Sequence, residues 1–263
     1  MESLLDLYAH TDIWLLIFCR LIATITMLPI VLETKVPALA VGGIITTLTM
    51  IVFFTVPFEV VGYTGSLISY TLLLIKEILV GTAIGFSMLI FFQIFNWTGQ
   101  LLSNQGGLSM STFYDPTTAS QIPLLGRLFT LSFSMVFILS GGYHWFIVAL
   151  VKTFEYLPIG SAMFNPEIVG TILDAVAMFF EIGFKLSAPL VGVILIVDVG
   201  LGVLARAAPQ MNMFVIGLPL KLLLMLTMLI VLVNIMPFYF DLVIELLRNN
   251  FFNVLKGLMP TPY

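Results

Sequence analysis

"LARAAPQMNMFVIGLPLKLLL", residues 204–224, interrupts a chain that is otherwise apolar enough to dissolve in lipid. Pro209 predicts a break in a helix, because proline lacks an amide proton and clashes with the preceding turn. Polar side chains surround this break: Arg206, Gln210, Asn212 and Lys221. Irregular backbone at membrane depth persists only where protein or water covers it. The stretch therefore predicts a polar-tipped helical hairpin with a second break at Pro219, in a channel-like or transporter-like assembly.

The composition places the rest of the chain in a membrane. Of 263 residues, 60% are hydrophobic and 9% charged, against about a quarter charged in soluble domains. A bilayer is crossed by about 20 helical residues. The apolar segments of that length are residues 13–31, 37–58, 67–95, 122–150, 168–197 and 213–240. We therefore predict an all-α membrane protein, with helices kinked or broken at Pro189 and Pro219.

Charged side chains inside these segments constrain what surrounds them. They are Arg20, Lys76, Glu77, Arg127, Asp174, Glu181, Lys185 and Lys221. Each would cost about 2.5 to 3.5 kcal/mol if it faced lipid at mid-depth, on the order of 20 kcal/mol together. We infer that they face one another, protein partners or a water-filled path, as in an obligate complex.

Spacing predicts how some of these charges pair. Asp174, Glu181 and Lys185 lie seven and four residues apart, which places them on one helix face and allows a Glu181–Lys185 ion pair. We favour an assembly seam over an ion-coupling or gating site for this face. Lys76 and Glu77 are adjacent and point about 100° apart, so we expect them to contact two different neighbours. The small pair Gly81 and Gly85 permits close approach of another helix.

Several function classes are excluded by what the sequence lacks. The net charge is −4 with no basic run, whereas nucleic-acid binding needs clustered Lys and Arg. Cys19 is the single cysteine, so no internal disulfide forms. His10 and His144 lack metal-ligand spacing. We predict no enzymatic activity, no cofactor and no metal.

Three stretches carry a resemblance to a known family. They are "GQLLSNQGGLSMSTFYDPTTASQIPLLGRL" (residues 99–128), "FEYLPIG" (154–160) and "LARAAPQMNMFVIGLPLK" (204–221). Together they closely resemble the FliR family, the export-gate subunits of the flagellar type III secretion system. Homologues in virulence-type injectisomes share the "APQ.N" core, but the residues that surround this core here, "ARAAPQ.N.FVIG.PLK", look more like the flagellar branch.

The resemblance implies a fold and partners. It implies stacked helical hairpins around a pore, with a FliP-like part at residues 1–150 and a FliQ-like part at 151–263. It also implies a complex with FliP and FliQ, joined by FlhB, in the bacterial inner membrane at the flagellar basal body. Unfolded flagellar proteins would be exported through this complex.

The resemblance further implies that residues 106–120 form a plug in the pore. The residues that suit this task are Gly106, Gly107, Met110, Phe113, Tyr114, Asp115 and Pro116. The glycines permit tight bending, and the methionine and aromatic side chains give a yielding obstruction. An ordinary surface loop is the alternative for this segment. Pro209, Gln210 and Asn212, with Lys221, would belong to the FliQ-like hairpin near the cytoplasmic entrance.

Two other functions stay open from the residues alone. An ion-coupled secondary transporter would use Asp174, Glu181 and Asp198 as coupling acids, with proline-broken helices as gates. A purely structural scaffold would tolerate deletion within residues 106–120 without leaking ions.

Overall fold

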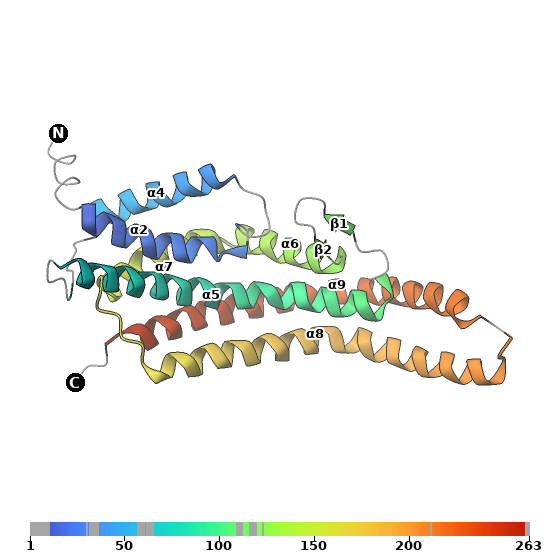
Figure 1. Ribbon diagram of the computed structural model, residues 1–263. Helices are drawn as coiled ribbons and strands as arrows, with labels where there is room; N and C mark the ends of the chain where they lie inside the picture. Colours follow the sequence, from blue (N-terminus) through green and yellow to red (C-terminus); the bar gives the residue numbers. More distant parts are fainter. Residues whose placement is uncertain are drawn as a thin grey trace. The chain divides into compact units, whose positions relative to one another are not determined.

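A computed structural model gives the fold, and it describes residues 11–29, 31, 37–56, 61, 66–108, 113–115, 120–122, 124–210 and 212–260. Within these residues the ordered elements are helices and one short β ladder (Figure 1). The helices are α2 (Thr11–Thr26), α4 (Ala38–Thr55), α5 (Leu67–Gln105), α6 (Leu124–Leu139), α7 (Gly142–Tyr156), α8 (Pro166–Ala207) and α9 (Met213–Leu258). The strands are β1 (Phe113–Asp115) and β2 (Ser120–Ile122). The predicted all-α membrane fold is confirmed, with this ladder as an addition.

The number of spans differs from the six apolar segments. Among the described helices, α4, α5, α8 and α9 are long and apolar enough to cross a bilayer, and α6 with α7 would make a fifth if they form one span. Helix α2 has 16 residues, fewer than the roughly 20 that a perpendicular span needs. The segment at 122–150 is two helices, because the chain turns at Gly141 with a left-handed φ of 73°.

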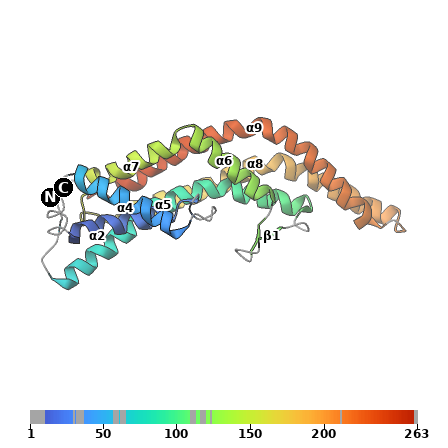
Figure 2. The same ribbon diagram turned by 90° about the horizontal axis from the view of Figure 1, so that it is seen from above.

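The predicted hairpin is present, and one of its predicted breaks is absent. Helices α8 and α9 run side by side in both views (Figures 1 and 2), and residues 208–212 connect them around Pro209. The break expected at Pro219 is wrong, because Pro219 lies inside α9. Pro189 likewise lies inside α8. A long apolar helix can absorb the one hydrogen bond that a proline removes, since neighbouring backbone groups adjust locally.

The described chain divides into two compact units that interleave along the sequence. Unit 1 contains Met1–Ile90, Ser140–Ala175 and Leu246–Tyr263, and unit 2 contains Phe91–Leu139 and Val176–Glu245. These units are defined by spatial contacts, so they do not test the predicted sequence halves, which stay a prediction.

In unit 1, helices α2 and α5 pack with their backbones in contact. A Cβ atom on Gly81 would lie 2.4 Å from the carbonyl oxygen of Arg20, and one on Gly85 would lie 2.8 Å from that of Thr24. The Thr24 hydroxyl donates a hydrogen bond to the Gly81 carbonyl at 3.1 Å. The close approach expected from this glycine pair is therefore confirmed.

In unit 2, aromatic rings fill the space between α5, α6 and α9. Phe95 stacks on Phe133 with centroids 4.4 Å apart, and Phe92 meets Phe133 edge to face at 4.8 Å. Phe240 of α9 packs on Phe95 at 4.9 Å. Aromatic pairs in such geometries contribute about 0.5 to 1.5 kcal/mol beyond the area they bury.

Helices α5 and α6 touch through two glycines that flank the predicted plug. A Cβ atom on Gly99 would lie 2.4 Å from both the Cα and the amide nitrogen of Gly126. A Cβ atom on Gly126 would lie 3.0 Å from the carbonyl oxygen of Asn96. No side chain fits between these backbones, so the two helices that lead into and out of residues 106–123 are held together near the loop.

This contact predicts opposite effects for two glycine-to-alanine changes. Gly99→Ala should destabilise the protein by about 1 to 3 kcal/mol, because the obstructing atoms are backbone and α6 must move. Gly42→Ala in α4 has nothing within 4 Å of the new methyl group, so it should gain up to about 1 kcal/mol of helix propensity. Thermal loss of the folded species in detergent, followed by size-exclusion chromatography, measures both. Equal thermostability of the two variants would contradict the backbone contact.

Candidate functional site

A buried ion pair joins α2 to α5 within unit 1. The Nε atom of Arg20 donates to Oε2 of Glu77 at 2.5 Å, and both side chains have no exposed surface. Nη1 of Arg20 donates to the carbonyl oxygens of Leu157 at 3.0 Å and Thr153 at 3.4 Å, at the end of α7. The guanidinium also lies 4.3 Å from the ring centroid of Phe154. Arg20 therefore joins α2, α5 and α7.

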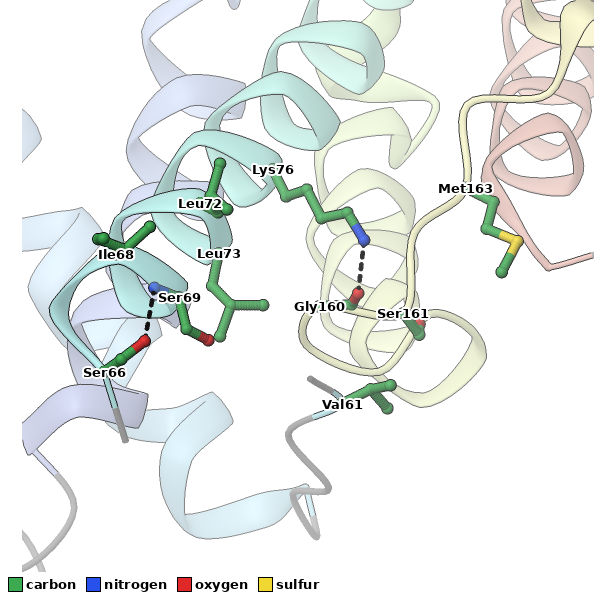
Figure 3. Close-up of a pocket in the computed structure, with 10 residues that line it drawn as sticks. All are labelled: Val61, Ser66, Ile68, Ser69, Leu72, Leu73, Lys76, Gly160, Ser161 and Met163. Carbon is green, nitrogen blue, oxygen red and sulfur yellow. Dashed lines mark hydrogen bonds between the residues drawn. The ribbon is translucent and has the colours of Figure 1, made fainter. Parts of the chain in front are cut away.

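The neighbouring residues of α5 hold the loop that follows α7. The second oxygen of Glu77 accepts a hydrogen bond from the Gly160 amide at 2.9 Å. Nζ of Lys76 donates to the Gly160 carbonyl at 3.0 Å (Figure 3). The expectation that Lys76 and Glu77 cannot face the same neighbour is wrong, although Glu77 also has a second neighbour, Arg20. Both reach Gly160, because the amide and carbonyl groups of one residue can be met by two long side chains from different directions.

Gly160 is required at this point of the "FEYLPIG" motif. Its φ of 79° lies in the left-handed region, which side chains with a Cβ rarely adopt. A Cβ atom there would lie 2.4 Å from the carbonyl oxygen of Val61. From the sequence, Arg20 is one of the charged residues within the apolar segments, but the sequence indicates no particular role for Arg20 or Gly160. The signal for Arg20 was its place in an apolar helix, where an unpaired charge is costly.

The α8–α9 hairpin carries a second ion pair, in unit 2. Nζ of Lys221 contacts the carboxylate of Asp198 at 2.5 Å, and both side chains are partly exposed. At the tip, Arg206 is in the last turn of α8, and Pro209, Gln210 and Asn212 lie in the exposed connection. The irregular tip is where the sequence predicts it, whereas Lys221 lies within α9.

The ion pair predicted from four-residue spacing is also present. Nζ of Lys185 donates to Oε1 of Glu181 at 2.5 Å. Both side chains are more than half exposed, and Asp174, earlier on α8, is exposed as well. The structure thus brings Glu181 and Lys185 together on the surface of this chain. This exposed pair within one helix differs from the Arg20–Glu77 pair, which is buried and joins two helices.

The predicted plug begins with two differently used glycines. Gly107 has a left-handed φ of 77°, which confirms the bend expected there. Gly106 leaves room for Met225, whose Sδ would lie 2.0 Å from a Cβ on that glycine. The loop start thus rests on α9.

Farther along, β1 and β2 pair antiparallel, with Phe113 opposite Ile122, Tyr114 opposite Gln121 and Asp115 opposite Ser120. This places three predicted plug residues in β1. Met110 and Pro116 lie outside the described residues.

No metal-binding cluster is found where the structure describes the chain, since no three His, Cys, Asp or Glu side chains gather there. The described polar groups instead tie backbone segments together in unit 1 and mark exposed faces of α8 and α9 in unit 2. Such an arrangement positions a protein surface and a loop, and offers no converging set of reactive side chains in these parts.

Comparison with known proteins shows a consistent similarity. The model of the bacterial export proteins, family 1, matches residues 12–247. The flagellar biosynthetic protein FliR of Escherichia coli (strain K12) is 33% identical over 203 residues, 77% of each chain. FliR of Bacillus subtilis (strain 168) is 31% identical over 261 residues, 95% of this chain and 97% of its own. The secretion system apparatus protein SsaT of Salmonella typhimurium (strain LT2) is 29% identical over 65% of this chain and 67% of its own.

The buried pair predicts a large penalty for removing one partner. Glu77→Ala should lower the free energy of unfolding by about 3 to 5 kcal/mol, because it leaves the Arg20 charge buried without a carboxylate. Glu181→Ala removes a carboxylate from an exposed pair and should change the stability of the chain little. Recovery of folded protein after graded heating in detergent measures both.

A double variant separates charge from packing at the same position. Arg20→Met combined with Glu77→Leu replaces the pair by apolar groups and should recover part of the stability that Glu77→Ala loses, since apolar replacement of a buried pair is often nearly neutral. If Glu77→Ala were as stable as Glu181→Ala, the buried pair would have no structural importance.

Proposed function

The chain belongs to the bacterial export proteins, family 1, and from this premise we propose that it is the gate subunit whose loop at residues 106–120 closes the passage. As a member of this family it is a component of a type III secretion export gate and a protein of the inner membrane. It is not an enzyme. What we propose beyond membership is the plug, the named partners and the exported substrates.

The way in which α5 and α6 hold the ends of the loop supports the assignment of residues 106–120 as a plug. Its flanking helices are clamped by the Gly99–Gly126 contact, so both ends of the loop are fixed close together. Gly107 turns the chain out of α5. Strands β1 and β2 have three residues each, and an isolated two-stranded ladder is marginally stable. A loop whose ends are fixed and whose two short strands pair weakly can obstruct a passage and still give way to an exported chain.

The poorly covered helices support obligate partners. In the most apolar 18-residue stretch of α5, 61% of the residues are buried, against 11% in α8 and 17% in α9. Exposed charges on α8, at Asp174, Glu181 and Lys185, accompany this apolar surface. We infer that FliP, FliQ and FlhB subunits cover these faces at the flagellar basal body and that unfolded flagellar proteins pass between them. On this proposal residues 1–150 are FliP-like and 151–263 FliQ-like.

The transporter alternative is not favoured. Two of its three coupling acids already have a lysine partner, Asp198 with Lys221 and Glu181 with Lys185. The family match points to protein export and not to solute transport. The flagellar relatives named above also align over a larger share of the chain than SsaT does.

The plug predicts an ion leak when the loop is shortened. Replacing residues 109–122 by a short Gly-Ser link should give open-channel currents across planar bilayers containing the complex, because the obstruction is removed while the α5–α6 clamp stays. A Gly-Ser loop of the original length serves as the control and should leak less, since it lacks bulky side chains but still crosses the passage. Copurification of FliP and FliQ establishes that the complex is intact. An intact complex whose shortened loop leaves the conductance unchanged would remove the plug assignment.

The exposed charges of α8 predict an assembly defect. Glu181→Ala or Lys185→Ala should lower the yield of the intact complex before it changes export by the complex that remains, because the exposed pair adds little to the fold of this chain. Lys152→Ala, an exposed lysine of α7, is the control and should leave the yield unchanged. Mass determination of the purified complex gives the yield. Full assembly with abolished export would indicate an ion-coupling site on α8.

A further inference from the structure

A row of amide side chains lies on α5 in the turns that lead to residues 106–120. Nδ2 of Asn96 donates to Oε1 of Gln93 at 2.9 Å, and Nε2 of Gln100 donates to Oδ1 of Asn96 at 3.0 Å. These three side chains are partly exposed, and the exposed Asn104 follows one turn later. Residues three and four apart share one face of a helix. We call the first three, which are joined by hydrogen bonds, the amide ladder.

The other faces of α5 beside the amide ladder are covered by helices of unit 2. On one side Phe95 packs on Phe133 of α6 and on Phe240 of α9. On another side Trp97 meets Phe184 of α8 edge to face, with centroids 4.9 Å apart. The amide ladder is therefore the face that the described helices leave open.

The residues at one heptad position of α5 change from apolar to amide along the helix. At intervals of seven residues, about two turns, α5 carries Leu72, Leu79, Phe86, Gln93 and Gln100. The three apolar side chains are between 37% and 60% exposed, which suits contact with lipid or an apolar partner. Amide groups that faced lipid would lack hydrogen-bond partners at a cost in free energy. The amide ladder therefore faces something that can form hydrogen bonds.

The amide ladder keeps hydrogen-bonding capacity at both ends. A carboxamide has two donor hydrogens and one acceptor oxygen. Within the described part of the chain, the Gln93 nitrogen donates no hydrogen bond and the Gln100 oxygen accepts none. The bonds to Asn96 hold all three side chains in a row. The ladder thus offers donors at one end and an acceptor at the other, and it carries no charge.

The position of the amide ladder relates it to the loop. Helix α5 ends at Gln105, directly before residues 106–120. Asn96 also lies against the start of α6, where the chain has left the loop, since a Cβ atom on Gly126 would lie 2.8 Å from Oδ1 of Asn96. The ladder therefore lies beside the two helix ends that hold the loop, and a chain that displaces the loop would meet it.

An unfolded polypeptide matches this surface better than a folded helix does. Each residue of an unfolded chain, apart from proline, presents an unpaired N–H and C=O group. In a helix these groups bond to one another. Carboxamides can accept from the one group and donate to the other, and they repel neither acidic nor basic side chains.

We propose that Gln93, Asn96 and Gln100 line the passage and form hydrogen bonds with the backbone of the exported polypeptide. This inference rests on the proposed export function and adds to it a surface that contacts the substrate. A hydrogen bond exchanged against water contributes little net free energy, so the polypeptide is guided without being held. The uncharged surface accepts acidic and basic segments alike.

A charge placed in the amide ladder tests this contact. The intact complex is supplied with two unfolded reporters of equal length and with the same export signal, one acidic and one basic. Gln100→Glu should lower the ratio of acidic to basic reporter exported about fivefold, and Gln100→Lys should raise it about fivefold, the effect of one pair of charges about 4 Å apart in water. Asn234 is an exposed amide of α9 in the same unit. Asn234→Asp and Asn234→Lys are the controls and should leave the ratio unchanged.

Crosslinking covers the case in which a charge at position 100 prevents assembly. A photoreactive amino acid in place of Gln100 should crosslink to a reporter arrested in transit by a folded domain at its end, whereas the same amino acid in place of Asn234 should not. An exporting complex whose ratio neither Gln100 variant changes would overturn this inference and leave the export function standing. A crosslink from position 100 to another subunit and not to the reporter would do the same. Failure of the unsubstituted complex to export either reporter would overturn the export function, and this inference with it.

Discussion

The burial of the Arg20 guanidinium is the constraint on which the rest of unit 1 depends. An ion of this kind loses several kcal/mol of hydration when it is buried, even after the protein relaxes around it. Glu77 balances its charge, and Nη1 donates to carbonyl groups at the end of α7, while Nη2 is buried without a hydrogen-bond partner among the described residues. Three helices must therefore stay in register for this one side chain to keep its contacts. Glu77 then fixes Gly160, so the same pair also positions the loop that follows α7.

Unit 2 is held by a different kind of contact. Its described core combines buried aliphatic side chains with aromatic rings and with glycine backbones in van der Waals contact, as at Gly99 and Gly126. The ion pairs described in unit 2 lie at its surface. The side chains of Glu181 and Lys185 are more than half exposed, and those of Asp198 and Lys221 are partly exposed. The Arg20–Glu77 pair is used inside the chain, whereas exposed charges on an apolar helix surface, as at Glu181 and Lys185 of α8, are suited to association with other subunits.

Local features of the sequence were predictable, and contacts between distant residues were not. The break at Pro209 and the Glu181–Lys185 pair each depend on neighbours within one or two turns, which spacing alone determines. Arg20 and Glu77 are 57 residues apart, and no periodicity identifies such a partner. The break predicted at Pro219 is absent because a proline in the sequence shows only where a backbone hydrogen bond is lost. Whether the helix continues past it depends on the packing around it, which the sequence does not show. The stretches at residues 99–128, 154–160 and 204–221 together indicated the family, but they did not predict the β ladder within the first of them.

The two kinds of contact also separate closure from assembly in the proposed gate. The clamp between Gly99 and Gly126 is made of uncharged backbone atoms, so ionic strength should affect it little. The pair of Glu181 and Lys185 is exposed, and salt screens such charges over about 10 Å at 0.1 M. A gate built in this way can lose affinity for its partners in high salt while its loop stays anchored. The anchoring of the plug and the association of the subunits therefore depend on different forces, although α5, α8 and α9 run continuously through both units of the chain.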